Sequence, residues 1–380
     1  MAATSEEILD RLKQGNLIEG EVLQELFLEK AVVVGARLTK CDLSSSRFMG
    51  AELRGGDFSR SVFDDADLRY SDLRESRFLD CRMTGAKLSF AKLDGVDLEL
   101  ADLTGVEMEK STLTGTLVTK TKFIDATLND VDLGKCSSLD HVDFSDASLD
   151  SVLFASARAR GLKFRNSHLR LVSFLEAELA DTDFEGCRFS RVMLDRCKGT
   201  GMGFRELRAV SSSFRGASFE EADFVGSLFD SCDLSGANLQ RGKFRDVRFS
   251  GESSLSGANL DQSDLSTAHF DEVDLTGASL RNAVLAGAEL KAVKMTRVRL
   301  EGADLHGLDL RGVDLEGALL AGANLRGTHL TWANLRQAEF DAPTIVGMVL
   351  HGEVPGLAQA SLPESLEVQP NLAEMLCDLR

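Results

Sequence analysis

A bulky apolar residue returns at every fifth position along most of this chain, and this period restricts the possible folds more than any other feature. Of the 22 phenylalanines, only Phe27 and Phe90 lie off this period. In the middle of the chain every fourth repeat carries a phenylalanine. The result is a ladder with 20-residue spacing, formed by Phe144, Phe164, Phe184, Phe204, Phe224 and Phe244.

A period of five fits neither regular secondary structure. On an α-helix, a step of five residues gives no persistent apolar stripe, and on a straight strand an odd period moves the side chain to the opposite face. The chain must therefore bend at every repeat. Within a repeat, as in Ala66-Asp67-Leu68 and Ala303-Asp304-Leu305, apolar and polar residues alternate. We therefore expect Ala and Leu to point inward and Asp to point outward.

The repeat is clear from Val33 and continues to Leu350 in three blocks, and its spacing is compatible with a start at Ile18. One extra residue shifts the phase within 134–138, and a second shifts it within 250–254. Counting repeats across the first shift places Phe123 in the same column as Phe144. We predict that a one-residue bulge at a corner absorbs the insertion and keeps both rings on one wall.

The tandem Ala-(Asp/Asn)-(Leu/Phe)-x-x pattern resembles the pentapeptide-repeat family over about 31–350, or over 17–350 with the weaker first repeats. The resemblance implies an all-β solenoid, a right-handed quadrilateral parallel β-helix of about 16–17 coils with four repeats per coil. The phenylalanine ladder independently supports a coil of four repeats, because four repeats of five residues give its 20-residue spacing.

Short helices are expected at both ends, which divides the chain into a cap at 1–16, the repeats at 17–350 and a tail at 351–380. At the N-terminus, Thr4 and Glu7 fit a capping box, followed by three apolar residues on one helix face: Ile8, Leu9 and Leu12. This helix is expected to cover the open edge of the first coil.

All four prolines lie between Pro343 and Pro370, so 351–370 is predicted to be irregular. Residues 371–379 are predicted to form a short helix with Asn371 as its N-cap. Such a short helix needs a surface to pack on, which is the last coil of its own solenoid, a second copy in a homodimer, or a partner protein.

The formal net charge is −18, of which residues 31–350 carry −10. An acidic chain is a poor partner for a nucleic-acid backbone, so direct nucleic-acid binding is not expected. The seven cysteines include no CxxC pair, and neither a signal segment nor a long apolar run is present. We therefore predict a cytoplasmic protein. Five cysteines occupy the small inward position two residues before a repeat centre, where packing explains them: Cys41, Cys81, Cys187, Cys197 and Cys232.

Polar residues that could support chemistry fit the repeat pattern better than they fit a site. Three of the six histidines occupy outward positions, namely His168, His269 and His329, and the others are His141, His306 and His351. Aspartates recur at the same outward position: Asp67, Asp97, Asp102, Asp183, Asp223, Asp274, Asp304, Asp309 and Asp314. Alternation along one column, as in Arg37, Asp57, Arg77 and Asp97, predicts cross-strand charge pairing. We predict no catalytic residue, no cofactor site and no metal site.

Small residues interrupt the repeat centres at Gly199, within the glycine-rich stretch 199–203, and at Ala159 and Ala209. They allow either an internal void or surface groove, or local repacking, in which Leu207 fills the space beside Ala209. Repacking is the simpler interpretation.

The favoured function is a non-enzymatic protein-binding rod or scaffold with flat faces. The stretch before the repeats resembles that of bacterial members associated with secretion machinery, which implies an accessory role there. The alternative is a DNA-mimicking role, since some members of the family bind DNA gyrase or topoisomerase and protect it from inhibitors, which gives antibiotic resistance. Acidity favours this alternative, whereas the absence of a long projecting loop and the alternating outer charges argue against it.

Overall fold

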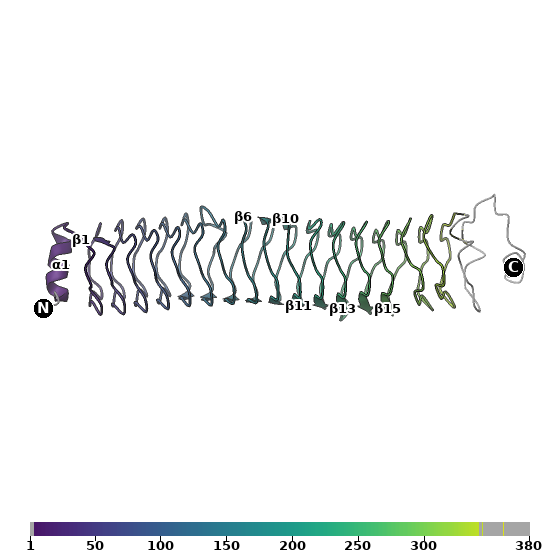
Figure 1. Cartoon of the computed structure of the whole chain (residues 1–380), viewed down its shortest axis with the longest axis horizontal. Coiled ribbons are helices and arrows are strands. Elements are labelled where there is room, and N and C mark those ends of the chain that lie inside the picture. The colour runs from purple at the N-terminus through teal and green to yellow at the C-terminus, as the bar shows by residue number, and fades with distance from the viewer. Residues whose placement is uncertain (1–3, 342–343, 345–359, 361–380) are drawn as a thin grey trace, which may run out of the picture. The chain divides into compact units, whose positions relative to one another are not determined.

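The computed structural model describes residues 4–341, 344 and 360, which fall into two compact units, Met1–Arg188 and Phe189–Arg380. Each unit is a parallel β-solenoid whose successive coils pair with one another (Figure 1). His351, most of the expected irregular tail and the predicted helix at 371–379 lie outside the described residues.

The strands are short, and most of the chain between them forms isolated bridges and turns. The first unit contains α1 (Ser5–Lys13), β1 (Leu17–Glu19), β2 (Arg37–Thr39), β3 (Glu107–Glu109), β4 (Thr127–Asn129), β5 (Ser148–Asp150), β6 (Arg158–Arg160), β7 (His168–Arg170) and β8 (Glu178–Ala180). The segment at the boundary is β9 (Arg188–Ser190). The second unit contains β10 (Lys198–Thr200), β11 (Arg208–Val210), β12 (Leu228–Asp230), β13 (Arg248–Ser250), β14 (His269–Asp271) and β15 (Glu289–Lys291).

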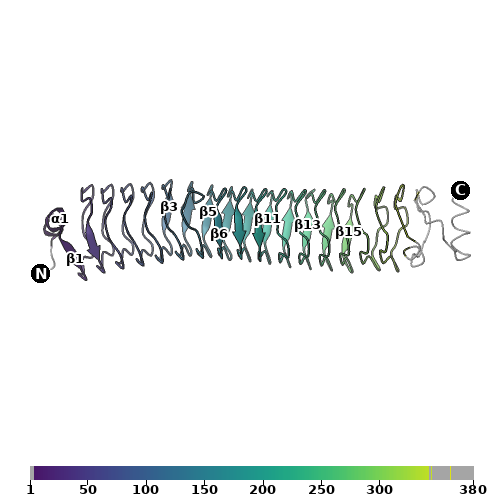
Figure 2. The same ribbon diagram turned by 90° about the horizontal axis from the view of Figure 1, so that it is seen from above.

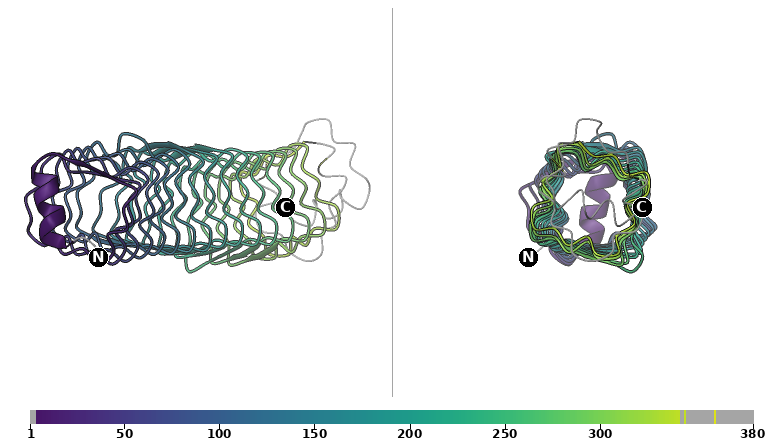
Figure 3. Two further views of the ribbon diagram at one scale, coloured as in Figure 1. Left: turned by 60° about the vertical axis from the view of Figure 1, so that its left-hand side comes forward. Right: turned by 90° about the vertical axis from the view of Figure 1, so that its right-hand side faces the viewer.

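Pairing follows the predicted 20-residue coil, since Leu17 pairs with Arg37 and Arg208 pairs with Leu228. Each coil has four sides, as the end-on view shows (Figure 3). In each unit the side that carries the largest group of paired strands is here called the strand wall of that unit. It carries β3, β4, β5 and β7 in the first unit and β11–β15 in the second (Figure 2). In most strands the central residue is buried and its neighbours face outward, which confirms the alternation predicted from the sequence.

Stacked phenylalanines fill the core beneath a neighbouring wall in each unit. In the first unit the Phe144 and Phe164 ring centroids are 5.0 Å apart with an interplanar angle of 8°, and Phe164 and Phe184 are also 5.0 Å apart. In the second unit Phe224 lies 4.6 Å from Phe204 and 4.8 Å from Phe244. Apolar burial of this kind is the main favourable contribution to folding, because a packed phenylalanine removes a large area from water.

The helix α1 caps the first coil as predicted. Thr4 and Glu7 form the capping box, and Ile8 and Leu12 are buried. Two polar contacts fix the helix on the coil. The Arg11 guanidinium lies 2.6 Å from the Glu21 carboxylate, and Ser5 Oγ accepts a hydrogen bond from the Phe27 backbone N–H at 2.9 Å.

The small inward position also holds the coils together through hydrogen bonds. Ser76 Oγ donates to the Leu53 carbonyl at 2.8 Å, and Ser61 donates to the Leu38 carbonyl in the same way. Cysteine replaces serine in this contact, because Cys81 Sγ donates to the Phe58 carbonyl at 2.9 Å. The packing role predicted for the cysteines therefore includes a weak hydrogen bond to the preceding coil.

Both insertions lie at corners between walls. At the first, Thr127 pairs with Ser148, which is 21 residues later instead of 20. This coil is therefore one residue longer, and the strand pairing continues across it. At the second, Gly251 and Glu252 both have left-handed backbone torsions, with φ of 63° and 60°. A Cβ on Gly251 would overlap the side chain of Asp230 and the backbone of Ser231, so glycine is required there.

Candidate binding groove

The outward aspartates have a structural role in every case that the sequence singled out. Each accepts a hydrogen bond from the backbone N–H two residues later, which supports the following turn. The Asp67 carboxylate, for example, takes the Arg69 N–H at 3.2 Å and also the Arg69 side chain. The hydrogen bond from the Arg69 side chain lowers the pKa of Asp67, and the backbone hydrogen bond adds to this effect. The same backbone contact is made by Asp97, Asp102, Asp183, Asp223, Asp274, Asp304, Asp309 and Asp314.

The described histidines occupy separate surface environments. His269 Nδ1 lies 2.8 Å from Glu289, and His306 Nδ1 lies 2.9 Å from Asp304. His168 Nε2 lies 2.9 Å from the Arg188 guanidinium. Among the residues that the structure describes, no three His, Cys, Asp or Glu side chains come together in a way that could hold a metal ion.

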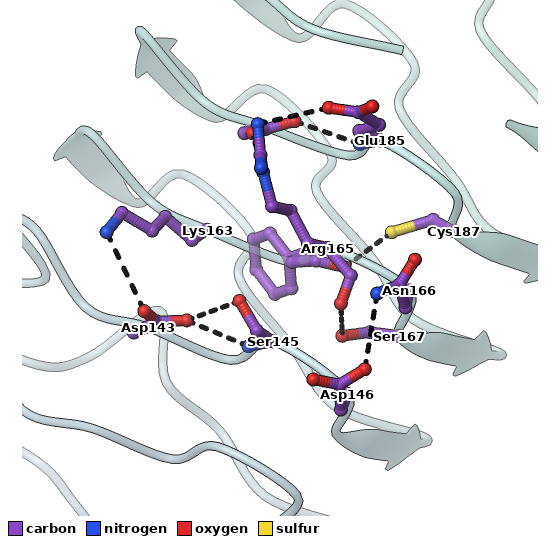
Figure 4. A network of polar contacts seen from close by, with 11 residues as sticks. Asp143, Ser145, Asp146, Lys163, Arg165, Asn166, Ser167, Glu185 and Cys187 are labelled. Atoms are coloured by element: carbon purple, nitrogen blue, oxygen red, sulfur yellow. Dashed lines mark hydrogen bonds and ion pairs between the residues drawn. The ribbon is translucent and has the colours of Figure 1, made fainter. Parts of the chain in front are cut away.

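Many charged side chains on the first unit form ion pairs with side chains of adjacent coils. Figure 4 shows one such region, where Arg165 pairs with Glu185 at 3.0 Å and Lys163 lies 3.7 Å from Asp143. Along another wall Arg77 lies 3.4 Å from Asp97, which confirms the predicted charge pairing for these two residues only. Among the described residues, Arg37 and Asp57 of the same column form no ion pair. The three ion pairs link side chains of adjacent coils.

The strand wall of the second unit is hollowed. A groove of about 820 Å³ runs along it over β11, β12, β13, β14 and β15. Its floor is formed by the strand centres, including Ala209 and Phe229, and its two sides are columns of outward side chains. The sequence predicted flat faces. That prediction is wrong for this wall, where Ala209 underlies one end of the groove and Leu207 is buried beside it.

One side of the groove carries two unpaired cations. Arg208, Leu228 and Arg248 occupy the same outward position in three successive coils. No ion pair of Arg208 or Arg248 is present among the described residues. Leu228 lies between them with 37% of its surface exposed. The column therefore presents positive charge, an apolar side chain and positive charge again.

The opposite side of the groove is mixed. It begins with Val210, which is 45% exposed, and continues with Asp230, which has no cationic partner among the described residues. The last two members are paired, since Lys291 lies 2.9 Å from Asp271. A hydrogen bond from Lys291 to Asp271 raises the pKa of this lysine, so it stays charged.

A second hollow of about 590 Å³ adjoins the groove and shares Glu289 and Lys291 with it. Trp332, the only tryptophan of the chain, lines this hollow and is 65% exposed. The neighbouring corner positions in the two preceding coils are Ala292 and Gly312, whose small size leaves the space open. An exposed tryptophan beside a hollow is a typical contact residue of protein interfaces.

Exposed apolar residues also occur on the first unit, and they include the following two groups. The first coil carries Leu17, Val22, Phe27 and Val32 at outward positions of four successive walls, so they do not converge on one site. Farther along, Tyr70 and Phe90 stack at a corner with ring centroids 4.9 Å apart. Phe27 and Phe90, the two phenylalanines off the five-residue period, are thus both on the surface.

The groove residues could not be recognised as a set from the sequence. Ala209 gave a signal, because it interrupts the column of large centres, but the favoured interpretation was local repacking. Arg208 and Arg248 occupy ordinary outward positions, and only the coordinates show that neither forms an ion pair with a described residue. No helix among the described residues has the length and apolar character needed to cross a membrane.

Solved structures that resemble this chain include pentapeptide repeat proteins. HetL, a protein involved in heterocyst differentiation regulation from the cyanobacterium Nostoc sp. strain PCC 7120, is 23% identical, with 79% of this chain and 97% of HetL covered and a TM-score of 0.17. QnrB1, a plasmid-mediated fluoroquinolone resistance protein, is 17% identical in a trypsin-treated variant, with coverage of 73% and 94% and a TM-score of 0.29. Rfr23 from the cyanobacterium Cyanothece 51142 is 22% identical, with coverage of 41% and 85% and a TM-score of 0.10.

No curated protein sequence matches the chain. The family model described as Pentapeptide repeats matches it eight times, at residues 41–80, 61–99, 81–119, 153–191, 212–251, 252–287, 268–307 and 303–341. These matches cover well over half of the sequence, and the coil of four five-residue repeats seen in the structure agrees with them. The chain therefore belongs to the pentapeptide-repeat family.

Proposed function

We propose that this protein is a non-enzymatic binding protein whose strand wall in the second unit is the contact surface for a protein partner. The observation that carries the proposal is the pair Arg208 and Arg248, unpaired on either side of the exposed Leu228 in a groove. An arginine on a protein surface retains much of its binding energy for a partner when no neighbouring carboxylate already engages it.

The surroundings of the groove support protein binding over catalysis. Histidine and carboxylate groups at the far end of the groove are paired, as in His269 with Glu289 and Asp271 with Lys291. A reaction centre needs a convergent acid, base or nucleophile, whereas these pairs are spread along a column of coils. Exposed apolar groups in the groove and Trp332 beside it are suited to contact with another protein.

The DNA-mimicking alternative requires a long stripe of negative charge. The net charge of −18 is in its favour. The outward carboxylates of the protein, however, are often paired with an arginine or a lysine of a neighbouring coil. Asp223, for example, lies near both Arg205 and Lys243. A gyrase supercoiling assay with the purified protein, with and without a gyrase poison, tests this alternative. Inhibition or protection would favour it over the groove.

Site-specific cross-linking tests the groove directly. A photoreactive amino acid replaces Leu228 in the groove or, as a matched control, Val284 on another wall of the same unit. The two side chains occupy equivalent outward positions and are 37% and 38% exposed. We expect cross-links in the native cell lysate from position 228, competed by unlabelled protein, and few from position 284. Equal cross-linking from both positions, or none from position 228, would contradict the proposal.

A further inference from the structure

We infer that the groove of the second unit accepts an amphipathic α-helix of a partner protein, with acidic residues seven positions apart and an apolar residue between them. This inference rests on the proposed function and specifies the shape and charge of the segment that binds. It rests on two observations: the spacing of Arg208 and Arg248 along their column, and the backbone pairing between coils, which leaves no free sheet edge in the groove.

The spacing of the column matches a helix. Successive coils are about 4.8 Å apart, which puts Arg208 and Arg248, two coils apart, at about 9.6 Å. Along a helix axis, residues seven positions apart are separated by about 10.5 Å, and residues three positions apart by about 4.5 Å. A glutamate at the first position can therefore meet Arg208, an apolar residue three or four positions later can meet Leu228, and a glutamate at the eighth position can meet Arg248.

An extended partner fits less well. On a strand, side chains of one face are about 6.8 Å apart, so a charge opposite Arg208 has its nearest equivalents at about 6.8 and 13.6 Å rather than near 9.6 Å. Strand addition also needs free backbone groups at a sheet edge. Arg208, Leu228 and Arg248 belong to strands that already pair with their neighbours in successive coils, so the wall offers no edge within the groove.

The length and charge of the groove are also suited to a short helix. From β11 to β15 there are four coil intervals, about 19 Å, which corresponds to about 13 helical residues. Asp230, on the opposite side, has no cationic partner among the described residues. A lysine or arginine on the second flank of the helix would complement it, so the two sides of the groove specify opposite charges on the two flanks.

The test uses designed peptides with the full-length protein. The probe is a fluorescent, side-chain-stapled, alanine-based helix of about 15 residues, with two glutamates seven positions apart and a leucine midway. Binding is measured by anisotropy at low and high salt. We expect Arg208→Glu with Arg248→Glu to weaken binding about tenfold or more, and a peptide with lysines in place of the glutamates to bind this variant better than it binds the wild type.

The controls separate specific binding from general charge attraction. Lys294→Glu with Arg326→Glu makes the same charge change at exposed positions on two other walls of the unit, and it should leave binding within about twofold. A peptide of the same composition broken by proline should bind at least tenfold more weakly. Equal binding of the broken peptide, an equal effect of the control variant, or failure of the lysine peptide to restore binding would overturn the inference. If cross-links form from position 228 but no peptide binds, the inference of a helical partner segment is wrong, whereas the proposed function still stands.

Discussion

Phe123 and Phe144 stack with ring centroids 5.2 Å apart and an interplanar angle of 10°, although 21 residues separate them instead of 20. The extra residue lies between the walls, and the ladder continues with Phe164 in the same geometry. The prediction that the two rings share a column is therefore confirmed. The insertion changes the length of one corner without rotating the stack, because the inward side chains fix the register of each coil.

Replacing Phe144 should show how much the ladder contributes to stability. Phe144 is fully buried and contacts Phe123, Phe154 and Phe164. Phe144→Ala should lower the free energy of unfolding by about 3–5 kcal/mol, because it leaves a cavity. Phe144→Leu should cost less, about 1–2 kcal/mol, since leucine is the usual alternative at repeat centres. Guanidinium denaturation of the two variants measures the difference, and equal losses would contradict this account of the stack.

The corner at the first insertion should tolerate no side chain at Gly134. A Cβ there would lie 2.6 Å from the Ala155 carbonyl oxygen, which is backbone and cannot rotate away. We expect Gly134→Ala to cost about 1–3 kcal/mol. Gly236→Ala is the comparison, since its Cβ would meet open space and only the left-handed backbone is unfavourable, at about 1 kcal/mol. Thermal unfolding should rank Gly134→Ala as the less stable variant, and the opposite order would show that the corner can relax.

Buried thiols should react slowly in the folded protein. Burial raises the pKa of Cys81 and Cys197 to about 12 and that of Cys232 to about 11, so few thiolates form at neutral pH. In a Cys377→Ser background, which removes the thiol beyond the described residues, we expect slow labelling by a thiol reagent at pH 8 and rapid labelling in denaturant. Rapid stoichiometric labelling of the native protein would show that these positions open readily.

The ion pair of Asp72 with Arg74 should make the free energy of unfolding depend on pH in the acidic range. The Arg74 side chain, 2.6 Å away, donates a hydrogen bond that lowers the pKa of Asp72 below its ordinary value of 3.8. A lowered pKa in the folded state means that the contribution is present above about pH 3.8 and is lost as the pH falls through the folded value. Asp72→Asn should cost about 1 kcal/mol at pH 7 and almost nothing near pH 2. A difference that stays constant with pH would show that the charge does not contribute.

Trp332 offers a direct fluorescence signal from the hollow that adjoins the groove. Because it is the only tryptophan and is 65% exposed, the emission of the native protein should resemble that of indole in water and should be quenched readily by iodide. Unfolding should change the emission wavelength little. A blue-shifted native spectrum or protection from iodide would show that the residue is covered. The matched variant Trp332→Phe should remove the signal while leaving the fold intact.

The sequence alone determined the coil. A five-residue period with small and large apolar residues at fixed positions can be buried only if the chain turns at every repeat, and the spacing of the phenylalanine ladder predicted the 20-residue register. The four-sided solenoid was implied by the resemblance to the pentapeptide-repeat family, and the capping box of Thr4 and Glu7 predicted the helix α1. The same pattern predicted that the outward aspartates have a structural role in the repeat and are not catalytic residues. These features depend on neighbours that the local repeat itself specifies.

Only the tertiary structure decided where the surface departs from the repeat. Arg77 and Arg208 occupy equivalent outward positions in the sequence pattern, yet Arg77 lies 3.4 Å from Asp97 whereas Arg208 faces an open groove. The physical reason is that the charge state of a surface depends on residues 18–21 positions away, in the next coil, and on the rotamers that bring them together. The period fixes which residues point outward, but the pairing across coils determines which of them remain available to a partner.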